Sequence, residues 1–214
     1  MARIMILGAG RFGLKAVRVL SQQKNNRITV VDADPERCEA LTGEGIDAVS
    51  ADGIASLAGS LKGPDPPDWI IPAIPLHVAF EWLQTTLPLG SALELLPVPE
   101  PVRAQLPNPL EGTSGQVYVS YADFVCPEDC PEPADVCTFT GKARKGILHR
   151  TLAQIQHADY TSVVLRSLQM APGLGGYRSD DLFAARTRVL AATGPVMLST
   201  ACKCHGVIQA FRIT

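Results

Sequence analysis

The stretch Arg3-Ile4-Met5-Ile6-Leu7-Gly8-Ala9-Gly10-Arg11-Phe12-Gly13 decides the fold of the amino-terminal part of the chain. Residues 3–7 form a short apolar run that is typical of a buried strand, and residues 12–22 carry apolar side chains at helical spacing. The three glycines between them match the pattern G-x-G-x-x-G, directly after a strand and directly before a helix. The stretch therefore predicts a strand-turn-helix unit that binds a dinucleotide.

Each glycine of the turn has a separate physical task. Gly8 permits the tight turn off the strand, and Gly10 lets the backbone approach a pyrophosphate that a Cβ atom would block. Gly13 lets the helix pack closely on the sheet. The amino end of the helix adds free N–H groups and a partial positive charge, both of which favour phosphate.

An acid at the end of the second predicted strand, residues 27–31, indicates which nucleotide is bound. Asp32 follows Gly13 by 19 residues, where its carboxylate can accept hydrogen bonds from a ribose diol. The next residue is Ala33, and no Arg or Lys stands beside the acid to neutralise a 2′-phosphate. This predicts NAD(H) rather than NADP(H). Two alternatives stay open: ATP or ADP as the ligand, and a glycine-rich turn that binds nothing.

Three segments of the first half resemble the TrkA N-terminal family, which is also called RCK or KTN. They are Ile6-Leu7-Gly8-Ala9-Gly10-Arg11-Phe12-Gly13, Val30-Val31-Asp32-Ala33-Asp34-Pro35-Glu36-Arg37, and Ala51-Asp52-Gly53, where the family usually has Gly-Asp-Ala. The resemblance covers residues 1–90. It implies a Rossmann fold, binding of NAD(H) or adenine nucleotides, and regulation of potassium channels and transporters, commonly as a dimer or larger ring.

By this resemblance Asp32 would hold the adenosine ribose, Ala33 and Arg37 would lie near the adenine, and Asp52 would stand at the end of the third strand. The partners implied are further copies of the chain and a membrane transporter or channel subunit. The candidate cofactor-binding residues are Gly8, Ala9, Gly10, Arg11, Phe12, Gly13, Asp32, Ala33, Arg37, Asp52 and Ala73.

Composition limits the other classes of function. The formal net charge of the 214 residues is -2 and charged residues make up 19%, so no strong field would attract nucleic acid or an anionic membrane. The amino terminus has no signal-peptide pattern, and the apolar stretch at 70–80 is too short and too rich in proline to span a bilayer. We therefore expect a cytoplasmic protein that is not inserted in a membrane.

Alternating predicted strands and helices in the first 90 residues indicate an α/β fold with a Rossmann-like, doubly wound parallel sheet. Between Pro64 and Pro109 the chain holds 11 of its 17 prolines, which exclude long helices apart from the piece at 76–87. We expect a nucleotide-binding domain over 1–95 and a smaller α/β extension or second domain over 96–214. A surface connection within one domain is the alternative. Further predicted strands lie at 116–121, 161–168, 196–199 and 207–213, and a capped helix at 179–192.

Five cysteines and a histidine fall in two loops of the second half, and we take all six as candidate metal ligands. They are Cys126, Cys130, Cys137, Cys202, Cys204 and His205. Thiolates favour zinc and iron-sulfur clusters, but the spacing fits no standard pattern. A redox-active thiol pair and unligated cysteines are the alternatives. Cys38, on a predicted helix, is most simply a small buried hydrophobe.

Other candidates are weaker. His77 begins the helix after the fourth strand and could act as a general acid or base near a nicotinamide, although a capping or solvated role is more common. The glycine-rich run 171–177 could form a second anion site or a flexible loop. The basic stretch at 142–150, together with His149 and His157, is expected to form a solvated face. No catalytic residue can be named from these patterns.

Two hypotheses follow for the function. The first is a regulatory protein in which NAD(H) occupancy shifts a conformation that a partner detects. The second is an NAD-dependent oxidoreductase whose second half supplies substrate groups and a zinc or iron-sulfur centre.

Overall fold

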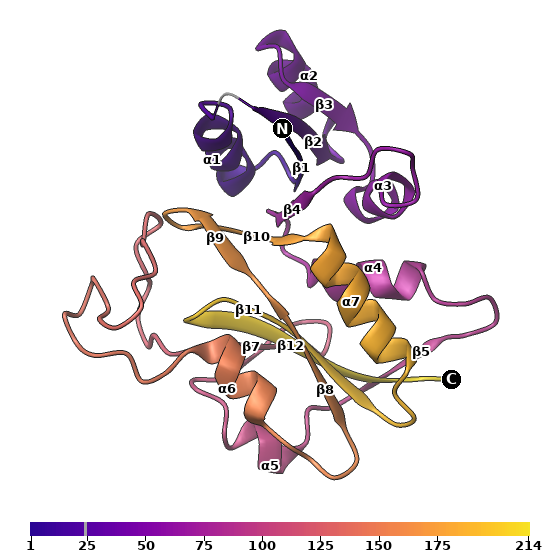
Figure 1. Cartoon of the computed structure of the whole chain (residues 1–214), viewed down its shortest axis with the longest axis vertical. Coiled ribbons are helices and arrows are strands. Elements are labelled where there is room, and N and C mark those ends of the chain that lie inside the picture. Colours follow the sequence, from indigo (N-terminus) through magenta and orange to yellow (C-terminus); the bar gives the residue numbers. More distant parts are fainter. Residues whose placement is uncertain (24) are drawn as a thin grey trace. The chain divides into compact units, whose positions relative to one another are not determined.

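The structure is a computed structural model that describes residues 1–23 and 25–214 (Figure 1). The chain forms two compact units. Unit 1 comprises Met1–Thr86 and Leu174–Asp180, and unit 2 comprises Leu87–Gly173 and Asp181–Thr214. Both units combine helices with sheets that contain parallel strands, which confirms the predicted α/β class.

Unit 1 has a sheet in the order β3-β2-β1-β4-β10, in which β1 to β4 are parallel and β10 is antiparallel to β4. Its strands are β1 (Ala2–Leu7), β2 (Asn26–Asp32), β3 (Asp47–Ser50), β4 (Trp69–Pro72) and β10 (Leu174–Arg178). Its helices are α1 (Arg11–Leu20), α2 (Pro35–Gly43), α3 (Gly53–Ser60) and α4 (Val78–Thr85). Helices connect consecutive parallel strands, as a Rossmann-type fold requires.

The parallel sheet forms because β1 is apolar along almost its whole length. Residues 4–7 are all buried, as expected for a strand covered on both faces. The connections from β1 to β2 and from β2 to β3 run across the sheet one way, and the connection from β3 to β4 runs the other way. Because such crossovers are right-handed, α1 and α2 lie on one face of the sheet and α3 lies on the other. The sequence did not predict α3, whose Gly and Ser content is high, but Asp52 caps its first turn.

The glycine-rich run before α7 does not form the predicted loop or anion site. Residues 174–178 instead form β10, which pairs with the edge of β4 in the register Tyr177 to Ile70 and Arg178 to Trp69. Tyr177 is almost fully buried in this arrangement. The expectation was wrong because glycine content indicates turns, whereas this run lies against an unpaired strand edge that needs a partner.

Unit 2 has a second sheet in the order β6-β7-β12-β11-β8, with β5 also paired to β12. Strands β8 and β11 are parallel and the other pairs are antiparallel. Its strands are β5 (Leu93–Leu96), β6 (Leu110–Glu111), β7 (Val117–Ser120), β8 (Thr161–Arg166), β9 (Leu168–Ala171), β11 (Val196–Ala201) and β12 (His205–Ile213). Its helices are α5 (Glu100–Arg103), α6 (Leu148–Gln154) and most of α7 (Ser179–Leu190).

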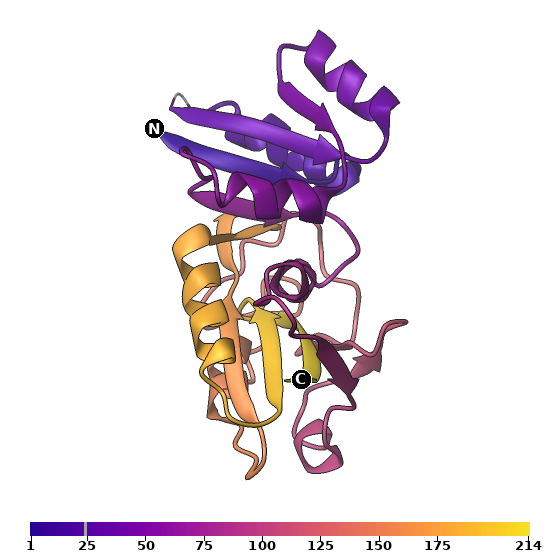
Figure 2. The same ribbon diagram turned by 90° about the vertical axis from the view of Figure 1, so that its right-hand side faces the viewer.

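A hydrophobic core lies between one face of this sheet and helices α5 and α6. It contains Val102 of α5, Leu148 and Leu152 of α6, and alternate residues of β7, β11 and β12. Helix α7 lies beside β8 (Figure 2), and the Arg188 guanidinium donates a hydrogen bond to the Ser162 carbonyl oxygen over 3.0 Å. The four strands predicted in the second half are confirmed as β7, β8, β11 and β12.

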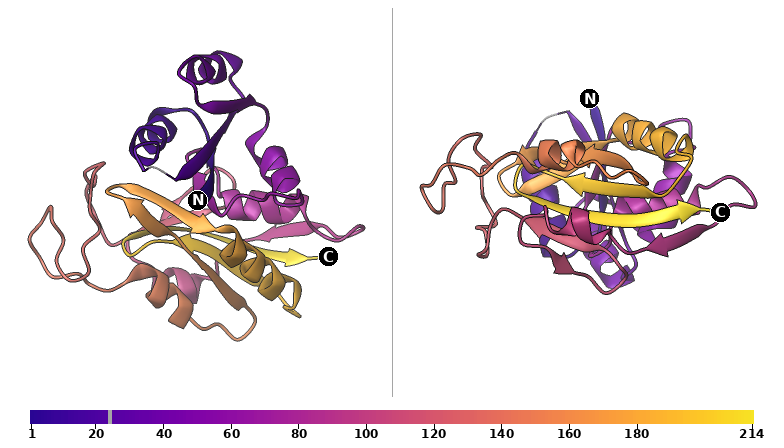
Figure 3. Two further views of the ribbon diagram at one scale, coloured as in Figure 1. Left: turned by 45° about the horizontal axis from the view of Figure 1, so that its top comes forward. Right: turned by 90° about the horizontal axis from the view of Figure 1, so that it is seen from below.

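The segment between β7 and α6, residues 121–147, contains no helix or strand in the described chain beyond one isolated bridge between Val136 and Ala143 (Figure 3). It carries three of the cysteines. Main-chain hydrogen bonds join it to the β11–β12 turn, since the Tyr121 amide donates to the Cys204 carbonyl oxygen over 2.9 Å. The loop is therefore held against the second cysteine-containing segment.

Candidate functional site

The glycine turn of unit 1 has the geometry that its sequence predicts. Gly8 adopts a φ of 102°, and a Cβ atom there would lie 2.7 Å from the Ala73 carbonyl oxygen. A Cβ atom at Gly13 would lie 1.8 Å from the Gly8 carbonyl oxygen, so only glycine allows α1 to pack this closely on the turn. Both glycines are required by the fold itself.

Gly10 differs from the other two glycines because the fold leaves space beside it. Its φ of -73° suits any residue, and a Cβ atom there would meet no described atom within 4 Å. Gly10 is the N-cap of α1 and has no side chain to cap the helix, and the first turn of α1 contains no acidic residue. The open space and the positive end of the helix dipole fit a phosphate group.

Asp32 joins this turn to the end of β2. Its Oδ2 atom accepts a hydrogen bond from the Ala9 amide over 2.5 Å, and its Oδ1 atom accepts one from the Asp34 amide over 2.8 Å. The side chain is 11% exposed. The carboxylate is thus fixed at the carboxyl edge of the sheet, where ligands of such sheets bind.

The expectation that no basic side chain stands beside Asp32 is wrong. The Arg37 guanidinium lies 3.8 Å from Asp32 Oδ2 and 3.1 Å from Asp34 Oδ2. Arg37 is not adjacent in sequence, but α2 begins at Pro35 and its first turn brings the side chain back toward the strand end. Two carboxylates share one guanidinium, so the group keeps a net negative charge.

The remaining candidate nucleotide-binding residues lie at the same edge of unit 1. Ala73 directly follows β4, and its amide donates to the Leu7 carbonyl oxygen over 2.8 Å. Ala33, Arg11 and Phe12 are exposed. Asp52 is the N-cap of α3, where its Oδ1 atom accepts a hydrogen bond from the Ala55 amide over 2.7 Å. Its contact with a nucleotide stays a prediction.

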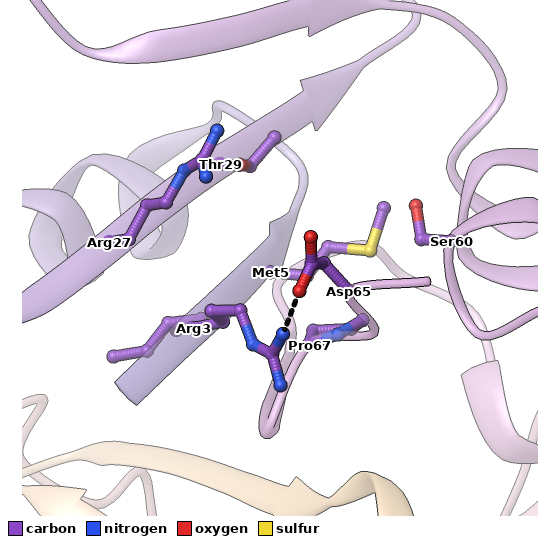
Figure 4. A pocket seen from close by; sticks show the side chains of 8 residues that line it. Arg3, Met5, Arg27, Thr29, Ser60, Asp65 and Pro67 are labelled. Carbon is purple, nitrogen blue, oxygen red and sulfur yellow. Dashed lines mark hydrogen bonds and ion pairs between the residues drawn. The ribbon is translucent and has the colours of Figure 1, made fainter. Parts of the chain in front are cut away.

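A cavity at the opposite edge of this sheet does not belong to the candidate site. It has a volume of about 220 Å³ and lies at the amino ends of β1 and β2, beside Arg3, Arg27 and Asp65 (Figure 4). An ion pair of 2.8 Å joins Arg3 and Asp65 there. Ligands of open parallel sheets bind at the carboxyl ends of the strands, so this cavity is not where a nucleotide is expected.

Two other histidines and Cys38, which the sequence analysis considered, have different surroundings. His77 is the N-cap of α4, as predicted, but it is only 4% exposed rather than solvated, and its ring stacks on that of Phe80. His149 is partly buried, and burial together with the charges of Arg166 and Arg150 lowers its pKa. Cys38 is buried, at 4% exposure, as expected for a small hydrophobe.

The two cysteine-containing segments of unit 2 meet. Cys126 Sγ lies 3.4 Å from His205 Nε2, and Cys202 Sγ lies 3.9 Å from His205 Nδ1. The Arg144 guanidinium donates a hydrogen bond to Cys204 Sγ. A C-x3-C-x6-C loop and a C-x-C-H turn that are 65 residues apart in sequence (Cys137 to Cys202) thus come together in space.

The thiols interact with one another electrostatically. Burial, followed by the charges of Cys130, Cys204 and Cys137, raises the pKa of Cys126. Burial also raises the pKa of Cys204, and the charge of Cys130 contributes to this rise. The hydrogen bond from Arg144 and the charge of Arg144 act in the opposite direction. Thiols of both the loop and the turn therefore influence the pKa of Cys126.

Cys202 is the more deeply buried thiol of the turn. Burial and the charge of Glu132 raise its pKa to about 12, and its Sγ atom accepts hydrogen bonds from the amides of Cys204 and His205. All six cysteines are free. Among the described residues, no group of three or more His, Cys, Asp and Glu side chains is placed to hold a metal ion.

Sequence reasoning missed two residues beside the cysteines. Glu132 is buried, and its Oε1 atom accepts a hydrogen bond from the Lys203 amide over 2.5 Å, which ties the loop to the turn. Arg144 belongs to the basic stretch that the sequence predicts to be solvated, but its guanidinium reaches Cys204. The only sequence signal for Glu132 was its place in a cysteine- and proline-rich loop.

The glycine turn, the fixed acid after β2 and the parallel sheet define unit 1 as a Rossmann-type nucleotide-binding unit of the TrkA-N class. Residues 4–71 match the model of the TrkA-N domain, and domains of this kind in general bind NAD(H). The particular family is given by the rest of the chain. Residues 79–214 match the model of a family described as "Uncharacterized protein, C-terminal domain".

A relative matches over almost the whole length of the chain. The chain is 32% identical over 223 aligned residues to an "Uncharacterized protein" of Archaeoglobus fulgidus, and the match covers 97% of this chain and 98% of that protein. The chain belongs to this family, and in this chain the TrkA-N match at residues 4–71 precedes the match at residues 79–214. Within the described residues, no helix combines the length and apolar character needed to cross a bilayer.

Proposed function

We propose that the chain binds NAD(H) at the glycine turn of unit 1 and acts as a regulator that senses this nucleotide. The pyrophosphate would lie over Gly10 at the amino end of α1, and the adenosine ribose would hydrogen-bond to Asp32. The observation that carries this proposal is the fixed carboxylate of Asp32, which is bound to the Ala9 amide of the same turn over 2.5 Å. A ribose diol can donate to its remaining lone pairs.

The charge around Asp32 favours NAD(H) over NADP(H). Arg37 is shared between Asp32 and Asp34, so the three side chains together carry a charge of about -1. A 2′-phosphate placed here would be repelled by the two carboxylates, and Arg37 would have to leave both of them to bind it. The Arg37 side chain is 55% exposed and its guanidinium can stack on a ring, which supports its expected place near the adenine.

The regulatory part of the proposal rests on the TrkA-N match, whose domains serve as nucleotide-dependent regulators. An assembly of several copies, a potassium channel or transporter subunit as the partner that detects the nucleotide, and a cytoplasmic location are parts of the same proposal. Binding of the nucleotide would shift the equilibrium between two conformations only if the nucleotide binds one of them more tightly than the other.

One observation favours a second candidate, an NAD-dependent oxidoreductase with a zinc or iron-sulfur centre. The cysteines of two distant segments gather in unit 2 beside His205, Glu132 and Arg144. Such a centre would give the second domain either a redox role or a structural role. NADH oxidation by the purified protein with an electron acceptor, lost in Cys126→Ser and Cys130→Ser, would favour the enzyme over the regulator.

Direct titration tests the nucleotide proposal. NADH fluorescence should change saturably on binding, and ADP or ATP should compete only at higher concentrations if the second ribose and nicotinamide contribute contacts. Equal affinity for NADH and ADP would favour an adenine-nucleotide sensor instead. The absence of saturable binding of any of these nucleotides would contradict the proposal.

A further inference from the structure

We propose that the open edge of strand β8 joins two copies of this chain, through antiparallel pairing of β8 with β8 of the second copy. The two copies would be related by a two-fold axis, so that the same surface is used on both. The inference rests on the proposed function in one respect only, since assembly of several copies is part of that function. The residues that carry it all belong to unit 2.

One edge of β8 has no strand beside it. Strand β8 is the last in the order β6-β7-β12-β11-β8, and among the described residues it pairs only with β11. Sheet edges are commonly protected by very short strands, by proline or by charged side chains. At the other end of this sheet β6 has only two residues, whereas β8 has six. Residues 161–165 of β8 include no proline and no charge, so this edge is suited to pairing.

The main chain of β8 presents hydrogen-bonding groups along the open edge. The Ser167 amide, just after the strand, donates to the Ala201 carbonyl oxygen of β11 over 2.8 Å. Successive residues of a strand direct their main-chain groups to opposite edges. The amides and carbonyl groups of Ser162, Val164 and Arg166 therefore point away from β11, where a further strand can pair with them.

Helices α6 and α7 lie on either side of β8 (Figure 1), and a hollow lies beside the strand next to each helix. A hollow of about 310 Å³ lies between β8 and α7, at Val164 and Arg166. Another of about 380 Å³ lies at the end of α6, at Tyr160 and Ser162. An added strand directs its side chains alternately to the two faces, so both hollows can receive them. The Ser162 carbonyl oxygen accepts the Arg188 guanidinium of α7 and keeps a second lone pair for a partner amide.

The charges at the two ends of β8 make the strand complementary to itself. Asp159 precedes the strand and Arg166 ends it, and both residues are exposed. Antiparallel pairing brings the end of each strand to the start of the other, so Arg166 of one copy meets the end that carries Asp159 of the other copy. The two-fold axis produces this contact between opposite charges twice. This complementarity favours a second copy as the occupant of the edge.

The test is the oligomeric state of the full chain, measured by sedimentation equilibrium over a wide range of protein concentration. We expect a reversible equilibrium between monomer and dimer. Arg166→Asp and Asp159→Arg should each raise the dissociation constant of the dimer at least about tenfold, because like charges then meet twice across the axis. The double variant exchanges the two charges and should return to within about threefold of the wild-type constant.

A further variant tests the main-chain pairing. Val164→Pro removes an amide that points to the open edge, so it breaks no hydrogen bond to β11, and it should weaken the dimer at least about tenfold. Val164→Thr keeps both the amide and a β-branched side chain, so it is the matched control and should form dimers like the wild type. Thermal melts show whether both variants are folded, and the exchanged charges decide the matter if Val164→Pro is not.

Two results would overturn the proposal. One is a wild type that stays monomeric, alone or with an unrelated protein bound at this edge. The other is a dimer that persists unchanged in Arg166→Asp and Val164→Pro, since another surface would then join the copies. NADH titration of each variant reports unit 1 separately. A monomer that binds NADH would contradict only this inference, and a β8-dependent dimer that binds no nucleotide would contradict only the nucleotide site.

Discussion

The Ala9 amide donates a hydrogen bond to Oδ2 of Asp32 over 2.5 Å, and this bond joins the glycine turn after β1 to the end of β2. The same carboxylate accepts the Asp34 amide through its other oxygen. Asp32 therefore has two roles: it fixes the turn that would hold the pyrophosphate, and it presents a charge to the ribose. Substitutions must separate these two roles.

Gly10 and Gly13 form a matched pair for this purpose. Gly10→Ala should fold normally, because a Cβ atom there meets no described atom within 4 Å, but should lower NADH affinity at least about tenfold by blocking the pyrophosphate. Gly13→Ala should be strongly destabilised, because its Cβ atom would lie 1.8 Å from the Gly8 carbonyl oxygen. Thermal melts and NADH titrations check both. Normal NADH affinity in Gly10→Ala would argue against a phosphate at this position.

Asp52 tests whether a candidate nucleotide-binding residue is only a helix cap. Asp52→Ala removes the hydrogen bond to the Ala55 amide and should cost about 1 kcal/mol, or roughly 2–4 °C in Tm. Asp52→Ser keeps a capping oxygen and serves as the control. If Asp52 also contacts the nucleotide, Asp52→Ser will bind NADH more weakly while its Tm stays near that of the wild type. Unchanged affinity would leave it as a cap alone.

Asp68 makes the stability of unit 1 depend on pH in the acid range. The hydrogen bond from the Arg3 amide, of 2.7 Å, is the largest cause that lowers the pKa of this carboxyl. A lowered folded-state pKa stabilises the fold above the ordinary value of about 3.9, and this contribution is lost as the pH falls through the folded-state pKa. The Tm difference between wild type and Asp68→Asn should therefore narrow below about pH 4.

Asp65 is the control for this acid dependence, since its ion pair with Arg3 is largely exposed and should contribute little. Asp65→Asn should melt close to the wild type at neutral pH. A Tm difference for Asp68→Asn that stays constant from neutral pH to pH 3 would contradict the assigned role of the carboxylate.

Much of unit 1 could be predicted because local sequence and tertiary structure agree there. The apolar run of β1, the glycine spacing and the acid after β2 each indicate the same fold. The strand β10 could not be predicted, because it is set by the open edge of β4 and not by its own glycine-rich sequence. The proximity of Arg37 to Asp32 likewise depends on a helical turn.

The candidate metal site was less accessible to sequence reasoning. The cysteines could be identified, but the position of both Cys126 and Cys202 beside His205 depends on contacts between segments far apart in the chain. Arg144 looked like part of a solvated basic stretch, because nothing local indicates that its guanidinium reaches Cys204. Composition can suggest a ligand set, whereas only the fold decides which members face each other.

The most direct test of the central claim is calorimetric titration of NADH and NADPH into the wild type and Asp32→Asn at one salt concentration. We predict that the wild type prefers NADH and that Asp32→Asn loses about 10- to 100-fold in NADH affinity, the equivalent of a charged hydrogen bond. NADPH affinity should change little, so the preference for NADH over NADPH should disappear in Asp32→Asn. An equal loss for both nucleotides, or a wild type that binds NADPH as tightly as NADH, would contradict the account.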